Sequence, residues 1–181
     1  MLTNPLPLLP LLLALLFTSL GHSAPITITD GKCHLQNHRL HLTLTTNINL
    51  PSDPLTALKS GLALYFYYQI EIEQTRPWLN HTTNHLYPIR LHYNPIAQTF
   101  VFNTANNPKT KSQPSLEQTL KTIGTLQSLS ILTLDSNTTA LRLKVRFRLD
   151  PQRLPAALQI SALNDSDWQL SSKWWTCQLA A

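Results

Sequence analysis

Two glutamates two positions apart, Glu71 and Glu73, are the residues of this sequence whose types and spacing come nearest to a catalytic pair. On a β-strand they would point to one face, about 6.5–7 Å apart along the backbone. Retaining glycosidases hold their two carboxyl groups about 5–5.5 Å apart and inverting ones further apart, so distance alone excludes neither reaction. Such enzymes bring the two acids from separate elements into a cleft. We therefore assign both glutamates to the polar face of a strand and predict no catalytic residue.

A second charged pattern lies in LRLKVRFRL, residues 141–149, where cations alternate with apolar side chains. If this strand lies beside the strand of Glu71 and Glu73, the opposite charges become cross-strand partners. The alternative is a surface that binds acidic lipid, polysaccharide or a partner protein. Nucleic acid is not expected, because aromatic residues are not interleaved with these cations on their face of the strand. The candidate binding face comprises Arg142, Lys144, Arg146, Arg148, Glu71, Glu73, Arg76 and Trp78.

The two cysteines, Cys33 and Cys177, lie near opposite ends of the chain. In an oxidising compartment they could form a disulfide, which would stabilise the fold by up to ~5 kcal/mol in the chain-entropy model. The alternative is two independent, half-buried thiols. A disulfide requires the first and last strands to lie side by side.

Histidines raise the question of a metal site. His34, His38 and His41 follow Cys33, and His81 and His85 are four positions apart. Both stretches are predicted to be strand or loop, and no carboxylate completes either set of ligands. We predict neither a metal site nor a cofactor.

Residues 1–20 contain no charged side chain and include a leucine-rich run from Leu6 to Phe17. That run has the length of a signal-peptide core and is short for a bilayer of ~30 Å. Small residues at Gly21 and Ser23 predict cleavage between Ser23 and Ala24. Residues 1–23 are thus predicted to be a signal peptide and residues 24–181 a single β-rich domain in the periplasm. Since no Lys or Arg precedes the run, an uncleaved membrane anchor is the alternative.

Alternation of apolar and polar residues predicts long strands over 39–50, 62–73 and 141–149. Shorter strands are predicted over 86–93 and 99–104, joined as a hairpin, and edge strands over 26–29, 130–134, 158–162 and 168–179. Two short helices are predicted. The first, SDPLTALKSG, begins at a cap of Ser52 or Asp53, and the second, PSLEQTLKTIG, has a capping box from Ser115 to Gln118. The polar segment between them, NTANNPKTKSQP (103–114), is predicted to be a loop. The fold class is mainly β: an antiparallel meander forming a β-sandwich or a curved sheet with two short helices.

The order of these segments resembles the DUF4390 family of exported bacterial proteins, over nearly all of residues 24–181. The matching marks are Thr75-Arg76-Pro77, Tyr93-Asn94, Arg148-Leu149-Asp150, Leu154-Pro155 and Trp168-x-Leu170-x-Ser172. The family has no established activity. The resemblance implies a signal peptide, a periplasmic location and, from frequent gene neighbours, an association with an NtrY-like sensor kinase. The pair of cysteines departs from the family pattern.

Three functions remain open at this point. The first is a non-enzymatic binding or accessory domain of the cell envelope, with exposed aromatics such as Trp78, Trp174 and Trp175 gathered at one edge or groove. The second is a regulatory partner of a membrane sensor histidine kinase. The third is an envelope glycoside hydrolase that uses Glu71 and Glu73. We favour the first.

Overall fold

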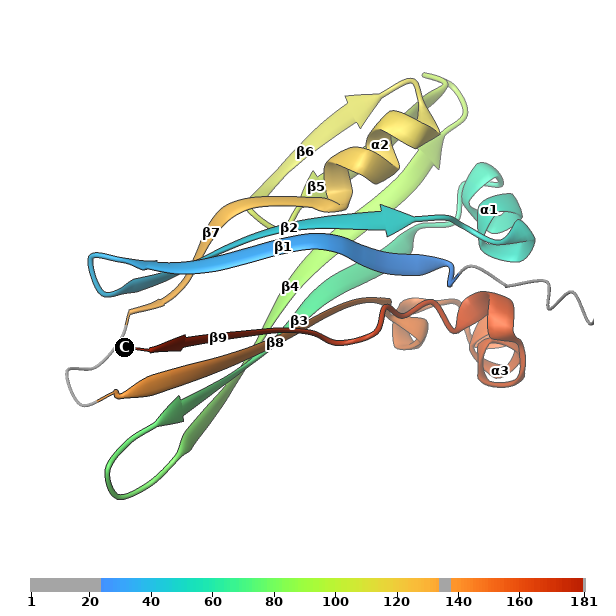
Figure 1. The fold of residues 1–181 in the computed structure, drawn as a ribbon. Helices are drawn as coiled ribbons and strands as arrows, with labels where there is room; N and C mark the ends of the chain where they lie inside the picture. The colour runs from blue at the N-terminus through green and yellow to red at the C-terminus, as the bar shows by residue number, and fades with distance from the viewer. Residues whose placement is uncertain (1–23, 134–137, 181) are drawn as a thin grey trace, which may run out of the picture.

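The computed structural model describes residues 24–133 and 138–180 and consists of two antiparallel sheets that face each other (Figure 1). One sheet has the strand order β1–β2–β7, formed by Ile26–Gln36, Arg39–Ile48 and Thr125–Thr133. The other has the order β6–β5–β4–β3–β8–β9, formed by Asn107–Gln113, Thr99–Thr104, His81–Asn94, Leu64–Thr75, Ala140–Leu149 and Trp175–Ala180. The predicted mainly-β sandwich is therefore confirmed.

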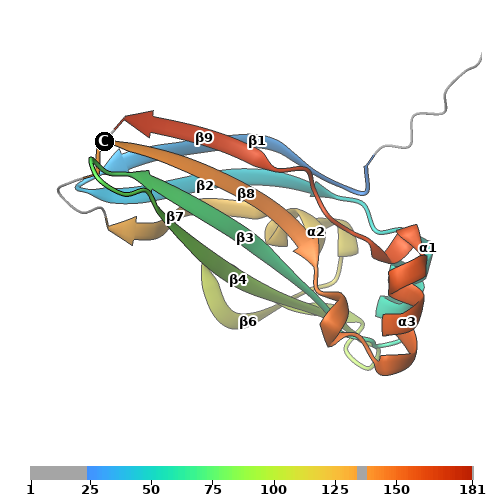
Figure 2. The same cartoon turned by 90° about the horizontal axis from the view of Figure 1, so that it is seen from below.

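Three short α-helices occupy the connections: α1 (Ser52–Lys59), α2 (Leu116–Ile123) and α3 (Ala156–Asn164). Two single 3₁₀ turns, η1 (Pro151–Arg153) and η2 (Ser166–Trp168), flank α3. Helices α1 and α3 lie together at one end of the sandwich, and the C-terminus lies at the other (Figures 1 and 2).

Alternating side chains of both sheets form the core, as the period of two predicts. On β3 the alternation is complete from Leu64 to Gln74, with every second residue buried. On β8 it runs from Leu141 to Leu149. Phe147 of β8 lies between two rings of β3: it stacks on Phe66 and meets Tyr68 edge-on, at centroid distances of 5.4 and 4.7 Å.

A buried hydrogen-bond cluster links the two sheets at Tyr68. The Tyr68 hydroxyl lies 3.1 Å from Thr46 Oγ1 of β2 and donates to the Gly124 carbonyl at 3.0 Å. Burial raises the pKa of Tyr68, and the hydrogen bond with Thr46 opposes that rise only in part. The Thr46 amide also donates to the Gly124 carbonyl, at 2.8 Å. A Cβ at Gly124 would overlap the backbone of Thr46, which explains a glycine here although its φ is an ordinary −77°.

At the opposite side of the sandwich, β1 lies against β9. A disulfide joins Cys33 to Cys177, with Cα atoms 6.5 Å apart. Next to it, the ring of Trp175 fills the space that a side chain at Gly31 would occupy. The first and last strands thus lie side by side.

Several predicted elements are wrong in type or extent. Residues 158–162 were expected to form a strand but lie inside α3, where the amides of Leu158 and Gln159 donate to the Pro155 carbonyl. A proline directly before the helix and good helix formers after it, such as Ala156, Ala157 and Leu158, favour this helix. Two helices were expected, and the described residues form three α-helices. The expected strand over 168–179 begins only at Trp175, and the start of that segment belongs to η2.

The polar segment 103–114 was expected to be a loop, but Asn107–Gln113 form strand β6, paired with β5 at the sheet edge. The expected cap of α1 is also wrong. The cap position is Pro51, and Ser52, already helical, donates to Asp167 Oδ2 instead. For α2 one of the two hydrogen bonds of the predicted capping box is confirmed: Ser115 Oγ accepts from the Gln118 amide at 3.3 Å.

Candidate binding face on the six-stranded sheet

The face of the six-stranded sheet that is turned away from β1, β2 and β7, here called the outer face, carries the two charged patterns. The register of β3 and β8 sets Glu73 opposite Arg142 and Glu71 opposite Lys144. Further along, Gln69 faces Arg146 and Tyr67 faces Arg148. The structure thus brings together the glutamates and the cations of β8, in the cross-strand arrangement that neutralises like-charge repulsion along each strand.

Each of three arginines lies over an aromatic ring on this face. Arg146 lies 4.4 Å from the centroid of Trp174, and Arg148 lies 5.6 Å from that of Tyr67. Both distances are within the ~6 Å range of cation–π attraction.

The third pair is Arg153 above Tyr65, at 5.1 Å. Arg153 belongs to η1. This turn lies close to β3, because the Asp150 amide just before η1 donates to the Tyr65 carbonyl of β3 at 2.7 Å. The Asp150 carboxylate accepts from the Gln152 amide and lies 3.5 Å from Arg153 Nε. These contacts hold Arg153 beside the end of β3.

The same end of the outer face is hollowed. A cavity of about 480 Å³ opens between β4 and η1 and is lined by Tyr65, Phe66, Tyr67, Leu86, Pro88, Arg148, Asp150, Pro151, Gln152 and Arg153. Arg148 Nε is shielded from solvent and has no hydrogen-bond partner in the described part of the chain. Arg146 Nε, in contrast, donates to Gln69 Oε1 at 2.8 Å. The cavity therefore combines aromatic walls with two guanidinium groups.

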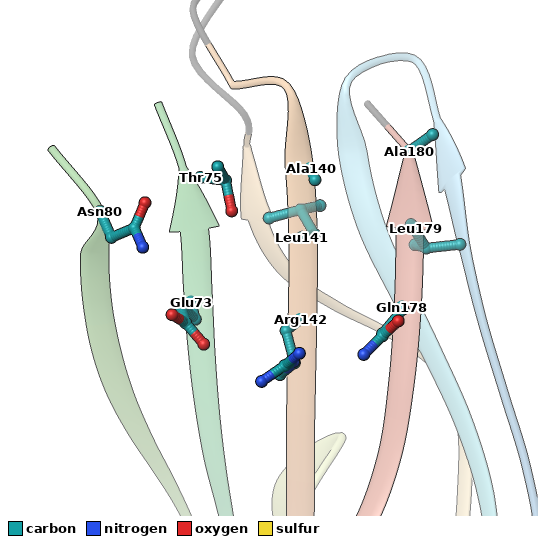
Figure 3. Close-up of a pocket in the computed structure, with 9 residues that line it drawn as sticks. All are labelled: Glu73, Thr75, Asn80, Ala140, Leu141, Arg142, Gln178, Leu179 and Ala180. Carbon is teal, nitrogen blue, oxygen red and sulfur yellow. The ribbon is translucent and has the colours of Figure 1, made fainter. Parts of the chain in front are cut away.

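A second cavity of about 510 Å³ lies at the other end of the face, toward the β3–β4 turn (Figure 3). Its residues are Glu73, Thr75, Asn80, Ala140, Leu141, Arg142, Gln178, Leu179 and Ala180. Glu73, Arg142 and Gln178 come from the neighbouring strands β3, β8 and β9 and lie in one row across the sheet (Figure 3). With its amide turned to suit its neighbour, the Gln178 oxygen accepts from Arg142 Nε at 3.2 Å.

Glu71 and Glu73 stand on one strand, as predicted, and not on two elements across a cleft. Gln69 Nε2 donates to Glu71 Oε1 at 3.4 Å, and Glu73 lies opposite Arg142. This arrangement positions both carboxylates beside cations and amides. It does not provide an acid and a nucleophile on opposite sides of a substrate bond.

The other two residues of the predicted face, Arg76 and Trp78, lie beyond the end of β3, and the partner of Arg76, Gln74, is on the buried side of that strand. Arg76 Nη2 donates to Gln74 Oε1 at 3.1 Å, and Trp78 is 96% exposed in the turn between β3 and β4. The expectation that Trp78, Trp174 and Trp175 gather in one place is wrong. Trp174 lies just before β9, with Arg146 over its ring, while Trp175 packs inward against β1. Alternation along β9 separates these neighbours onto opposite faces.

The structure adds three residues that sequence analysis did not select: Tyr65, Tyr67 and Arg153. The period of two did assign both tyrosines to the polar face of their strand. Their position on the sheet could therefore be predicted, but their contacts with arginines could not. Arg153 carried no sequence signal, because its position depends on the fold of η1 over the end of β3.

Histidines do not assemble a metal centre in the described residues, where no three His, Cys, Asp or Glu side chains come together. Cys33 is in the disulfide, and His34 and His41 stack on each other at a centroid distance of 5.3 Å across β1 and β2. His92 lies on β4, where burial, and then the charge of Arg90, lower its pKa. Within the described residues no helix has the length and apolar character needed to cross a bilayer.

These observations define a β-sandwich protein with a cationic and aromatic outer face. The chain matches the profile of the family described as a domain of unknown function (DUF4390) over residues 23–178, and it belongs to that family. Neither the curated proteins nor the solved structures contain a match to the chain.

Proposed function

We propose that this protein is an exported, non-enzymatic binding module of the cell envelope, and that its outer face binds an acidic polysaccharide. The observation that carries the proposal is the pair of arginines, Arg148 and Arg153, that lie over tyrosine rings and line one cavity. An aromatic ring under a guanidinium plane holds that plane in place, and the edge of the plane carries N–H donors that match a planar anion. A carboxylate accepts from such an edge with two parallel hydrogen bonds.

The shape of the cavity favours a polymer over a membrane. Leu86 and Pro88 of β4 and Pro151 and Gln152 of η1 line the cavity together with its two arginines. A single chain of sugars can enter such a hollow, whereas a lipid surface is broad and flat. Tyr65 and Tyr67 add apolar ring surface to the cavity, and aromatic rings of this kind suit pyranose rings as well as cations.

Export to the periplasm is part of the proposal. Its support is the leucine-rich segment before Gly21 and the disulfide between Cys33 and Cys177, because structural disulfides persist in oxidising compartments. Mass spectrometry of the protein from the periplasmic and membrane fractions of its host tests this part. A chain that starts at Ala24 with the disulfide closed supports it, and a full-length chain with two free thiols contradicts it.

The binding test uses residues 24–181 with polygalacturonate, which has one carboxylate per sugar, and with neutral dextran. The variant Arg148→Gln/Arg153→Gln removes two charges from the cavity, and the control Lys109→Gln/Lys111→Gln removes two exposed charges from the edge strand β6. Both variants lose the same net charge, so non-specific attraction falls equally.

We expect the cavity variant to weaken binding of polygalacturonate at least about tenfold, since each charge-assisted hydrogen bond contributes ~1.5–3 kcal/mol. The control should change affinity by less than about threefold, as expected for exposed charges. Equal weakening by both variants, or equal binding of dextran, contradicts the proposal. Binding to anionic vesicles in place of the polymer would also contradict it.

A further inference from the structure

Strand β4 has a long unpaired edge. It pairs with β3 from His81 to Leu91, but β5 covers only Leu91–Asn94 on the other side. Within the described residues no second strand pairs with the segment 81–89. Its pairing with β3 has no register shift, so this edge carries no bulge.

The other sheet edges each carry a device that blocks strand addition. Strand β6 carries Pro108, Lys109 and Lys111, and β7 is joined to β2 through two register shifts. Strand β1 is bulged between Ile28 and Asp30, and β9 is cross-linked to β1. Bulges, lysines and prolines are the usual means by which sheets avoid edge-to-edge pairing. The segment 81–87 contains none of them, and no formally charged side chain.

The direction of the unpaired groups follows from one hydrogen bond. The Arg90 amide points away from β3, because it donates to Asn103 Oδ1 on the β5 side. Backbone groups alternate in direction along a strand, so the amides of Thr82, Asn84 and Leu86 also point to the open edge. Pro88 shares this direction but has no N–H. It therefore ends the row of donors.

We infer that this edge pairs with the same edge of a second copy of the chain, antiparallel and centred on Asn84. In that register Thr82 of each copy lies opposite Leu86 of the other, and the two Asn84 residues lie opposite each other. All three outward amides of both copies then find carbonyl partners, about six hydrogen bonds in total. Pro88, which cannot donate, falls just outside the paired segment.

Side chains on the inner face of β4 fit the same register. Thr83 Oγ1 and His85 Nε2 are both shielded from solvent and lack a hydrogen-bond partner in the described part of the chain. Centred on Asn84, the pairing sets Thr83 of one copy directly opposite His85 of the other, as a non-hydrogen-bonded pair in which side chains are closest. Each hydroxyl then faces an imidazole nitrogen that it can donate to.

The choice of a second copy over an unrelated peptide rests on this self-complementarity and on charge. Two chains of formal charge +5 repel each other over their whole surfaces. The edge brings only neutral side chains into contact, so no repulsion between side chains opposes the pairing there. The pairing also carries the β3–β4 turn of each copy past Pro88 of the other. That turn holds Trp78 and Leu79, which are 96% and 75% exposed in the single chain. The inference does not depend on what the outer face binds.

Sedimentation equilibrium of residues 24–181, from micromolar to millimolar concentration, tests the pairing. We expect a monomer–dimer equilibrium. Asn84→Pro removes the amide at the centre of the pairing without touching a hydrogen bond to β3, and it should raise the dimer dissociation constant at least about tenfold. The matched control Asn84→Ala keeps the amide and should leave the constant within about threefold.

Cross-linking tests the register separately and does not depend on the proline variant being folded. Two cysteines in Asn84→Cys would have Cα atoms about 5.5 Å apart, within the range of a disulfide. In Thr82→Cys they would lie about 14 Å apart and out of reach. A covalent dimer of Asn84→Cys alone supports the inference. A monomer at every concentration, a dimer insensitive to Asn84→Pro, or equal cross-linking of both variants overturns it.

Discussion

Reduction of the Cys33–Cys177 disulfide should remove a large share of the folding free energy of this chain. The two cysteines are 144 positions apart, so the bond closes nearly the whole described chain into one loop. In the chain-entropy model a loop of that length restricts the unfolded state by about 5 kcal/mol. Typical domains have a total of only ~5–15 kcal/mol.

The folded state should tolerate the loss, because β1 and β9 also meet through the packing of Trp175 against Gly31. The expected effect is therefore on stability and not on structure. Urea unfolding followed by tryptophan fluorescence measures it, with and without reductant at one pH. With a slope of ~1–3 kcal/mol/M, the midpoint should fall by roughly 2 M.

The matched control is Cys33→Ala/Cys177→Ala, which should unfold near the reduced protein and should not respond to reductant. If reductant lowers the urea midpoint of the wild type by less than about 0.5 M, the reasoning is refuted, because the disulfide would then contribute only ~1 kcal/mol to the free energy of unfolding. It would mean that the reduced, unfolded chain keeps its two ends together or that the bond distorts the native strands.

Three further outcomes follow from the packing and the titration of single residues. Tyr68→Phe should cost ~1–2 kcal/mol in urea unfolding, because it leaves the buried Thr46 hydroxyl without its partner; an unchanged midpoint would contradict this role. Gly31→Ala should cost ~1–3 kcal/mol, since the new methyl group overlaps the ring of Trp175, and the double variant with Trp175→Ala should recover part of the loss. Burial lowers the pKa of His92 below its ordinary value of 6.5, so the folded chain resists its protonation and loses stability as pH falls through that range. His92→Gln should therefore lose less stability than wild type between about pH 7 and pH 5, and equal losses would contradict the assignment.

The charged face was predictable because a strand alternates with a fixed period. Once Glu71 and Lys144 are assigned to the polar faces of two half-buried strands, those strands need only be neighbours for the two charges to meet. The same reasoning separated the core side of β3 from its outer side without error. It could not select Tyr67 or Arg153, because their pairing partners lie in elements that approach only in the folded chain.

The missed elements have local causes. The apolar residues of 158–162 are compatible with a short strand or a helix turn. The carbonyl of Pro155, which accepts from the amides of Leu158 and Gln159, begins the helix here. Strand β6 has a loop-like composition, with lysines and a proline on an exposed edge. Such residues are typical of edge strands that must not pair further, and composition alone does not distinguish these from loops.

The most direct measurement of the central claim is an NMR titration of residues 24–181 with an oligogalacturonate, observing arginine side-chain Nε–H groups. The account predicts that Arg148 and Arg153 shift together and saturate at one affinity, because both line the same cavity. Arg39, which begins β2 in the other sheet, should not move. Shifts spread equally over Arg39 and the cavity arginines, or no shift at Arg148 at saturating oligomer, would contradict the assignment of the outer face as the binding site.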